Sequence, residues 1–217
     1  MRSVPIEIEI LHEDALLVAV AKPAGAIVVP GRGPAGEECL RDAVARHAGG
    51  RIWVVHRLDR EASGAVLFAK DPGTHRALSI QFEKRQVKKT YLALVQGRVA
   101  GDGEIDRPLR EFGSGKVGVA ADGKASLTRY RVQKRFRGAT LLVVEPASGR
   151  RHQIRVHLYS IGHPVMGDTR YGEDRPVGRA GRLMLHALEI VFSHPTAGPM
   201  TVACEPGPDF TGIIGAL

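Results

Sequence analysis

Cysteine is scarce in this sequence, and long apolar runs are missing from it. The 217 residues include two cysteines, Cys39 and Cys204, which are too few and too far apart for a disulfide scaffold or a cysteine-rich metal site. No apolar run reaches the length of a membrane span, and the N-terminal residues lack the apolar region of a signal peptide. We therefore expect a cytoplasmic protein without a membrane partner.

Acidic residues are outnumbered. Lys and Arg together number 31 against 23 Asp and Glu, which gives a net charge of +8. A basic domain favours a polyanionic partner, and nucleic acid is the first candidate because arginine pairs with phosphate and stacks on bases. The same charge also fits a protein that is simply basic, so charge alone does not settle the partner.

The expected elements are many strands and few helices. Alternating residues 6–10 and apolar residues 15–21 indicate strands, whereas residues 37–48 have helical spacing. Asp71 followed by Pro72 is a good helix start, because Asp caps helices and proline is favoured at the first helical position. Regular βαβ alternation is absent, which favours the α+β class.

One short stretch places an acid between two arginines. His56-Arg57-Leu58-Asp59-Arg60 follows an apolar segment and precedes a Ser-Gly turn signal. Arginine neighbours favour the ionised form of a carboxylate, which suits a nucleophile better than a general acid. The alternative is a structural ion pair of Asp59 with Arg57 or Arg60, and structural pairs outnumber catalytic ones.

A second dense motif covers residues 148–158. Ile154 and Leu158 have helical spacing, so one face of a helix is expected to be apolar. Arg151 and Arg155 would share another face, and Arg155 would flank the buried stripe, where an interior acid could meet it.

Histidine is common enough to raise the question of a metal. His152 and His157 are five residues apart, about 140° around a helix, so they do not converge as two histidines at i and i+4 would. We predict no metal site, and a metal-dependent nuclease is therefore disfavoured.

The motifs resemble those of the RluA family of RNA pseudouridine synthases. The likeness runs from about Glu13 to Phe210 and keeps the family's order, with Ala62 and Ser148 where the family usually has threonine. It is carried by residues 13–25, by His56-Arg57-Leu58-Asp59 with Ala62-Ser63-Gly64, and by residues 88–97, 148–158 and 162–172.

The resemblance implies a fold and an activity. The fold would be α+β, with a large mixed, mainly antiparallel sheet, flanking helices and a central RNA-binding cleft, as one catalytic domain over residues 1–217. The activity would be isomerisation of uridine to pseudouridine in ribosomal or transfer RNA, without a cofactor. We expect a monomer, and because the first motif begins by Glu13, we expect no N-terminal RNA-binding domain of the S4 type.

The resemblance also assigns roles to residues. Asp59 would be the nucleophile, Arg155 its partner, and Tyr91 the ring against the target base, although a core aromatic is the commoner fate of a strand tyrosine. Arg57 would fill the space that the base leaves. The expected RNA contacts are His56, Arg57, Arg60, Lys88, Lys89, Arg150 and Arg151.

A non-catalytic RNA-binding domain remains the alternative from another functional class. It accounts for the basic charge, but an acid between arginines opposes RNA binding. Replacing Asp59 by Asn separates the two hypotheses, because a binder would lose no function and a synthase would keep binding while losing all product.

Overall fold

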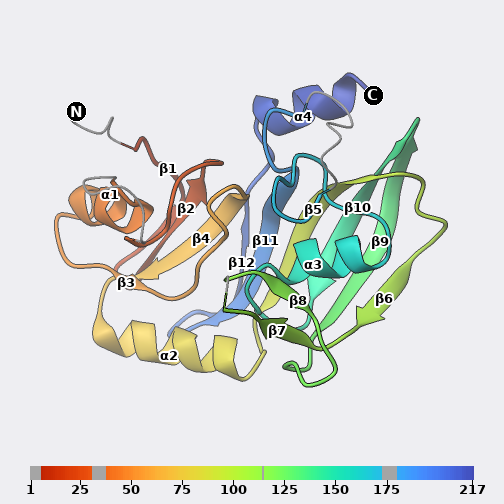
Figure 1. The fold of residues 1–217 in the computed structure, drawn as a ribbon. Coiled ribbons are helices and arrows are strands. Elements are labelled where there is room, and N and C mark those ends of the chain that lie inside the picture. The colour runs from red at the N-terminus through yellow and green to blue at the C-terminus, as the bar shows by residue number, and fades with distance from the viewer. Residues whose placement is uncertain (1–5, 31–37, 114, 173–179) are drawn as a thin grey trace. The chain divides into compact units, whose positions relative to one another are not determined.

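The computed structural model describes residues 6–30, 38–113, 115–172 and 180–217. The chain divides into two compact units (Figure 1). The first unit comprises Met1–Lys88 and Ala187–Glu205, and the second comprises Lys89–His186 and Pro206–Leu217. The expectation of a single catalytic domain stays a prediction.

The first unit contains antiparallel strands and two helices. Neighbouring strands follow the order β1-β2-β4-β11, with β12 paired to β11 and β3 paired to β4. Of β11, residues 187–194 belong to this unit. Its elements are β1 (Glu9–Glu13), β2 (Leu17–Lys22), α1 (Leu40–His47), β3 (Trp53–Val54), β4 (Ser63–Ala69), α2 (Pro72–Glu83), β11 (Leu185–His194) and β12 (Gly198–Ala203).

The start of the first unit differs from the expected strand. β1 begins at Glu9 and continues to Glu13, instead of covering residues 6–10. The turn comes later because Asp14 accepts hydrogen bonds through Oδ1 from the backbone N–H groups of Leu16 and Leu17, at 2.7 and 2.9 Å. An aspartate side chain that bonds its own backbone in this way closes a turn.

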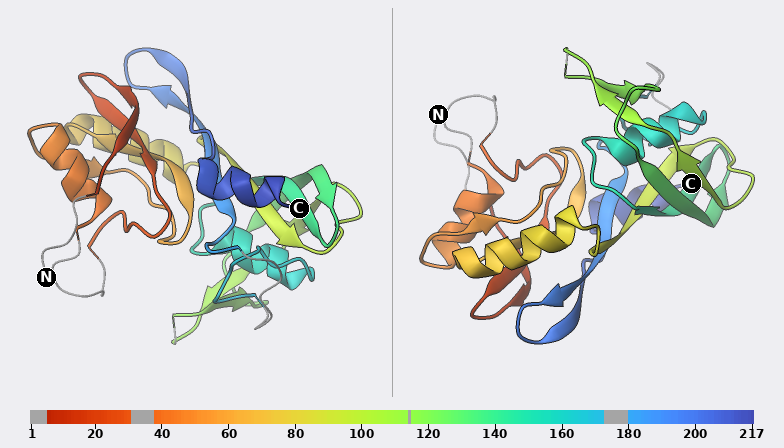
Figure 2. Two further views of the ribbon diagram at one scale, coloured as in Figure 1. Left: turned by 90° about the horizontal axis from the view of Figure 1, so that it is seen from above. Right: turned by 90° about the horizontal axis from the view of Figure 1, so that it is seen from below.

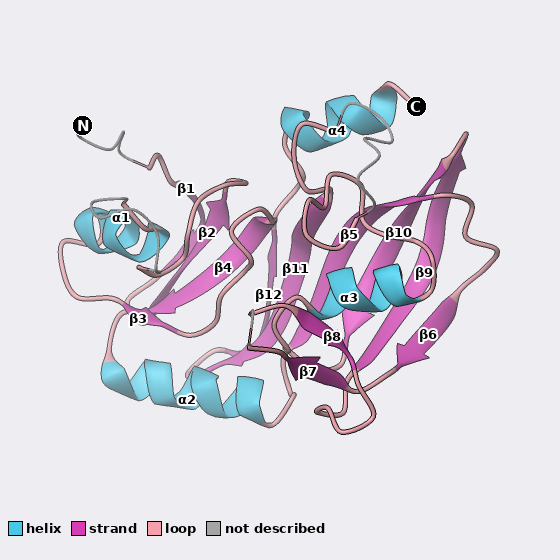
Figure 3. Cartoon of the chain, viewed as in Figure 1, coloured by secondary structure: helices cyan, strands magenta, loops and turns pink. Residues whose placement is uncertain are grey.

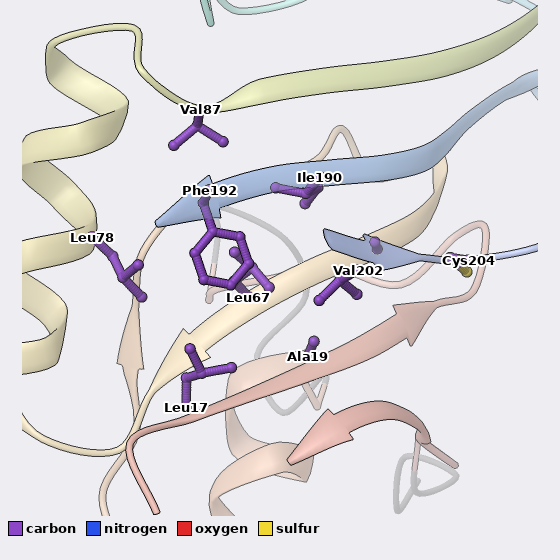
Figure 4. Packing of buried hydrophobic residues seen from close by; sticks show 10 residues of the cluster. Leu17, Ala19, Leu67, Leu78, Val87, Ile190, Phe192, Val202 and Cys204 are labelled. Atoms are coloured by element: carbon purple, nitrogen blue, oxygen red, sulfur yellow. The ribbon is translucent and has the colours of Figure 1, made fainter. Parts of the chain in front are cut away.

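The core of the first unit lies between its strands and α2. Leu17 and Ala19 of β2, Leu67 of β4 and Leu78 of α2 are fully buried and pack together (Figure 4). The expected cap of α2 is confirmed, since Asp71 accepts from the Thr74 N–H at 2.9 Å. Helix α1 begins at Leu40, and Glu37, where it was expected to begin, lies outside the described residues.

The second unit repeats the combination of antiparallel strands with helices. Its strand order is β5-β10-β9-β6, and β7 with β8 forms a separate ribbon that projects from the unit in both views of Figure 2. Its elements are β5 (Lys88–Gln96), β6 (Gly103–Asp106), β7 (Leu109–Glu111), β8 (Val117–Val119), β9 (Leu127–Phe136), β10 (Ala139–Pro146), α3 (Gln153–Ser160) and α4 (Pro208–Gly215).

The α+β class is confirmed. Helices and strands are not in regular alternation (Figure 3), and every strand pair with a described register is antiparallel. The central RNA-binding cleft stays a prediction.

Candidate active site

Asp59 lies in the loop between β3 and β4 of the first unit. Its side chain is half-buried, the neighbouring Leu58 is buried, and its backbone carbonyl accepts from the N–H of Ala62 at 3.2 Å. The flanking residues Arg57 and Arg60 are exposed. The loop therefore points its arginines toward solvent while an apolar residue anchors it.

A buried lysine forms a hydrogen bond with the backbone of this loop. Lys22, at the end of β2, is 1% exposed, and its Nζ donates to the carbonyls of Pro23 and Arg60, both at 2.9 Å. The Arg60 carbonyl also accepts from the Gly25 N–H at 2.8 Å. These two hydrogen bonds to one carbonyl mean that the turn at residues 22–25 fixes the backbone directly after Asp59.

The exit from the loop requires a glycine. Gly64 has a φ of +118°, and a Cβ at this position would lie 2.3 Å from the Ala187 carbonyl oxygen of β11. The side chain is therefore excluded both by conformation and by space. The Ser-Gly signal read from the sequence thus marks a close contact between strands rather than a surface turn.

The described contacts of His56 are with the backbone of β4 and with a side chain of α2. Its Nε2 accepts from the Leu67 N–H at 3.0 Å, which places the proton of the neutral ring on Nδ1. The ring stacks on Phe82 of α2 with centroids 4.8 Å apart. Its expected RNA contact stays a prediction.

Tyr91 and the two lysines lie on β5. Tyr91 is half-buried and sits opposite Val144 of β10. Lys88 is exposed, whereas Lys89 is partly buried and its Nζ lies 3.4 Å from the Ser148 carbonyl. Lys89 thus links β5 to the second motif of the sequence.

Helix α3 is fixed to β9 by two polar side chains one turn apart. Gln153 donates to the Leu127 carbonyl at 2.9 Å and accepts from the Ser148 hydroxyl at 2.7 Å. His157 bonds the Thr128 hydroxyl through Nδ1 at 2.8 Å and the Arg107 carbonyl through Nε2 at 2.9 Å. Burial lowers the pKa of His157, which keeps the ring neutral.

Between these two residues, Arg155 forms a buried ion pair with Asp168. Nε donates to Oδ2 at 2.7 Å and Nη2 donates to Oδ1 at 2.8 Å, which is a bidentate arrangement. The two side chains are 3% and 0% exposed. The guanidinium carbon also lies 5.3 Å from the ring centroid of the buried Tyr171.

The carboxylate of Asp168 is held ionised. Burial alone raises its pKa, but the hydrogen bonds and charge of Arg155, with the N–H groups of Arg170 and Tyr171, outweigh burial and lower the pKa. The two N–H groups reach Oδ1 at 2.9 and 3.0 Å. The ionised form of Asp168 is thus favoured, and its two hydrogen bonds from Arg155 fix the orientation of that side chain.

One expectation for this motif is wrong. Arg151 does not share a face of the helix with Arg155, because α3 begins only at Gln153 and Arg151 lies in the preceding turn. The reason is His152, whose φ of +53° interrupts the helical geometry. Arg151 is exposed and pairs with Glu111, and Arg150 is exposed as well.

Sequence reasoning missed Asp168 as the acid that contacts Arg155. It also missed Lys22 and Gln153 as side chains that hold the two motifs. Asp168 stood in a matched stretch of sequence, but nothing in the spacing related it to a helix thirteen residues earlier. A buried lysine beside a proline carries no periodic signal that would have marked it.

The described residues form neither a metal-binding cluster nor a membrane-spanning helix. Across residues 6–30, 38–113, 115–172 and 180–217, His, Cys, Asp and Glu do not gather in threes in a way that could hold a metal ion. Within the same residues, every helix is too short or too polar to cross a membrane.

Comparison with known proteins agrees with the motifs. The family model for RNA pseudouridylate synthase matches residues 16–160. Ribosomal large subunit pseudouridine synthase D of Nitrosomonas europaea is 38% identical over 218 residues, covering 94% of this chain and 63% of that protein. Dual-specificity RNA pseudouridine synthase RluA of Yersinia pestis is 37% identical over 203 residues, covering 90% of this chain and 98% of that protein.

Solved structures agree as well. Human RNA Pseudouridylate Synthase Domain Containing 1 has a TM-score of 0.78 and 27% identity, covering 96% of this chain and 86% of that one. Human RNA Pseudouridylate Synthase Domain Containing 4 also has a TM-score of 0.78, at 24% identity, covering 95% and 91% of the two chains, and bears on the fold alone. The chain belongs to the RluA family of RNA pseudouridylate synthases.

Proposed function

We propose that this protein isomerises uridine to pseudouridine in ribosomal or transfer RNA. The observation that carries the proposal is the family match over residues 16–160, a range that includes Asp59, Tyr91 and Arg155. The relatives named above include a ribosomal RNA enzyme and a dual-specificity enzyme, so either class of RNA is a candidate substrate. The net charge of +8 supports a polyanionic substrate.

The reaction breaks one bond and forms another within a single nucleotide. The C1′–N1 glycosidic bond breaks, the uracil turns, C5 bonds to C1′, and the proton on C5 is removed while N1 gains one. Atoms and electrons balance without an oxidant, a reductant or a group donor. We therefore propose that the enzyme needs no cofactor.

Asp59 is proposed as the nucleophile. It attacks the sugar or assists its deprotonation, which requires an ionised carboxylate in a fixed position. Two features support this role: the Lys22 bond to the Arg60 carbonyl fixes the adjacent backbone, and Leu58 anchors the loop. Arg57, which is exposed, is proposed to occupy the space vacated by the flipped base by stacking its guanidinium on neighbouring bases.

Arg155 is proposed to hold Asp59 ionised and oriented. A guanidinium has five N–H donors, and Asp168 accepts two of them, one from Nε and one from Nη2. This pair fixes the plane in which the guanidinium lies. Tyr91 is proposed to pack against the uracil and to help remove the C5 proton.

The remaining RNA contacts are also proposals. His56, Arg60, Lys88, Lys89, Arg150 and Arg151 are proposed to contact RNA, and the exposed arginines and Lys88 fit this role best. A cytoplasmic location and a monomeric state belong to the same proposal. Size-exclusion chromatography with light scattering tests the monomer directly.

The test of the function is replacement of Asp59 by Asn. RNA from a strain lacking the gene is labelled with carbodiimide, and primer extension reads the pseudouridines that wild-type protein restores. We expect Asp59→Asn to bind RNA and restore none. Restoration by this variant would overturn the nucleophile assignment, and absence of any wild-type product would overturn the function.

Three further variants separate the roles of Arg155 and Tyr91. Arg155→Ala is expected to be severely impaired. Tyr91→Phe is expected to retain more activity than Tyr91→Ala, because the ring rather than the hydroxyl is proposed to hold the base. Equal activity of the two Tyr91 variants would contradict the stacking role.

A further inference from the structure

A basic cavity in the first unit lies outside the motifs assigned so far. It has a volume of about 420 Å³ and is formed by residues of α1, by residues 51–54 and by α2. Arg41 of α1, Arg51, Trp53 of β3 and His75 of α2 supply its polar and aromatic groups, and the buried Ile52 contributes an apolar surface.

The groups in this cavity are organised rather than scattered. The guanidinium carbon of Arg51 lies 5.0 Å from the ring centroid of the half-buried Trp53. His75 bonds the Val54 carbonyl through Nε2 at 3.2 Å, which ties α2 to β3. Arg41 is oriented by Asp42, which accepts from its Nε and Nη2 at 2.8 and 2.6 Å without itself lining the cavity.

The sign of the charge distinguishes this cavity from two others in the second unit. Asp102 and Glu145 line one of those, and Glu111 and Asp122 line the other, so each places carboxylates beside its arginines. The described lining of the first-unit cavity contains cations and an indole but no carboxylate. Its chemistry therefore fits an anion that carries a flat ring.

We propose that this cavity binds one nucleotide of the RNA substrate, separate from the target uridine. The base stacks on the Trp53 and Arg51 platform, and the phosphate pairs with Arg41 and Arg51. Aromatic and guanidinium planes are the surfaces on which proteins stack unpaired bases. The choice of RNA over a free nucleotide rests on the proposed function, whereas binding of a nucleotide does not.

The position of Trp53 in the fold supports a nucleotide close in sequence to the target. Trp53 pairs with Ala69 of β4 and precedes Asp59 by six residues. The strands on either side of the Asp59 loop are thus joined at the cavity. A nucleotide held here would fix the RNA relative to that loop.

The chain contains a built-in reporter, because Trp53 is its single tryptophan. Titration with uridine monophosphate is expected to change the Trp53 emission in a saturable way, with N-acetyltryptophanamide correcting for absorption. Uridine without phosphate is expected to bind about tenfold more weakly, since a charge-assisted contact is lost. Inorganic phosphate alone is expected to compete with the monophosphate, and a short oligouridylate is expected to bind more tightly than the monophosphate.

Two arginine variants locate the site. Arg51→Ala and Arg41→Ala are each expected to weaken binding of the monophosphate about tenfold. The matched control is Arg46→Ala, which removes the same charge from the same helix but from a side chain that pairs with Glu38 and does not line the cavity. Equal weakening by Arg46→Ala, or no saturable response to the monophosphate or the oligouridylate, would overturn the proposal.

Nucleotide binding in the cavity and pseudouridine formation are measured separately. The titrations are also run in the Asp59→Asn variant, which is expected to keep the Trp53 response without forming pseudouridine. A Trp53 response without any pseudouridine from wild-type protein would retain the nucleotide site and reject the activity. Pseudouridine formation with no Trp53 response would reject the site alone. Tighter binding of the monophosphate than of the oligouridylate would reject RNA as the ligand.

Discussion

The two units each contain an aspartate that closes a turn in the same way, but the two aspartates contact different basic side chains. Asp14 of the first unit and Asp168 of the second both accept, through Oδ1, the backbone N–H groups two and three residues further along. Asp14 then contacts histidines with 30% of its side chain exposed, whereas the side chain of Asp168 is fully buried against Arg155.

The histidine contacts of Asp14 differ from each other. His12 bonds Oδ2 through Nε2 at 2.8 Å. His194 places its Nε2 3.1 Å from the same oxygen, within ion-pair distance but outside hydrogen-bond geometry. The Nδ1 of His194 accepts from the Ala197 N–H at 3.0 Å, so the proton of the neutral ring lies on Nε2, on the side of Asp14.

The different burial of Asp14 and Asp168 should decide how much each pair contributes to the free energy of unfolding. Water can replace a lost partner at the partly exposed Asp14, and a histidine is a cation only when protonated. At Asp168 the partner is an arginine that is 3% exposed, so removing either charge takes a bidentate partner from the other in the interior. We expect the same substitution to have very different effects in the two units.

The largest effect is expected for Asp168→Asn. The buried guanidinium of Arg155 would lose its compensating charge, and breaking a buried pair in this way costs about 3–5 kcal/mol of unfolding free energy. Urea unfolding followed by far-ultraviolet circular dichroism measures the change. A loss below about 1 kcal/mol would mean that Asp168 is not the main compensating charge of Arg155.

A smaller effect is expected when both charges are removed together. Replacing Arg155 by Met in the Asp168→Leu background removes the uncompensated cation, and apolar replacement of a whole buried pair is often neutral or stabilising. The double variant is therefore expected to be more stable than Asp168→Leu alone in the same unfolding assay. Additive destabilisation by the two substitutions would show that the pair does not act as a unit.

Only part of the buried ion pair in the second unit could be predicted from the sequence. Helical spacing placed Arg155 beside a buried stripe, where an interior acid could meet it, and the candidate acid was Asp59. Arg155 is buried, and the acid that the structure places against it is Asp168. The partner Asp168 depends on a tertiary contact across the turn after α3, which leaves no periodic trace. The proposed contact of Arg155 with Asp59 stays a prediction.

Secondary structure was predicted correctly where the signal is local in the sequence, and not where it depends on tertiary contacts. Asp71 with Pro72 is a local signal, and α2 follows it at the expected residue. The left-handed conformation of His152 and the length of β9, which runs to Phe136, arise from packing and pairing with neighbours. Spacing along one segment does not encode either feature.

A modest effect is expected for Asp14→Asn. The asparagine keeps an oxygen that accepts from Leu16 and Leu17, so the turn should survive, while the negative charge beside His12 and His194 is lost. Pairs with this much solvent contribute about 0.5–1 kcal/mol. Urea unfolding at neutral pH measures the difference, and a loss as large as that of Asp168→Asn would contradict the argument from burial.

The smallest effect is expected for the pH dependence of the stability difference between wild-type protein and Asp14→Asn. Burial alone raises the pKa of Asp14, but the bond from His12, the N–H groups of Leu17 and Leu16 and the charge of His194 together lower it from 3.8 to about 2. Because the pKa is lower in the folded state, the carboxylate stabilises the fold above about pH 4, and this contribution is lost as the pH falls through about 2. The stability difference between wild-type protein and Asp14→Asn should therefore shrink over this interval, as measured by urea unfolding at a series of pH values. A difference that stays constant down to about pH 2 would show that Asp14 is not stabilised by its ionised form.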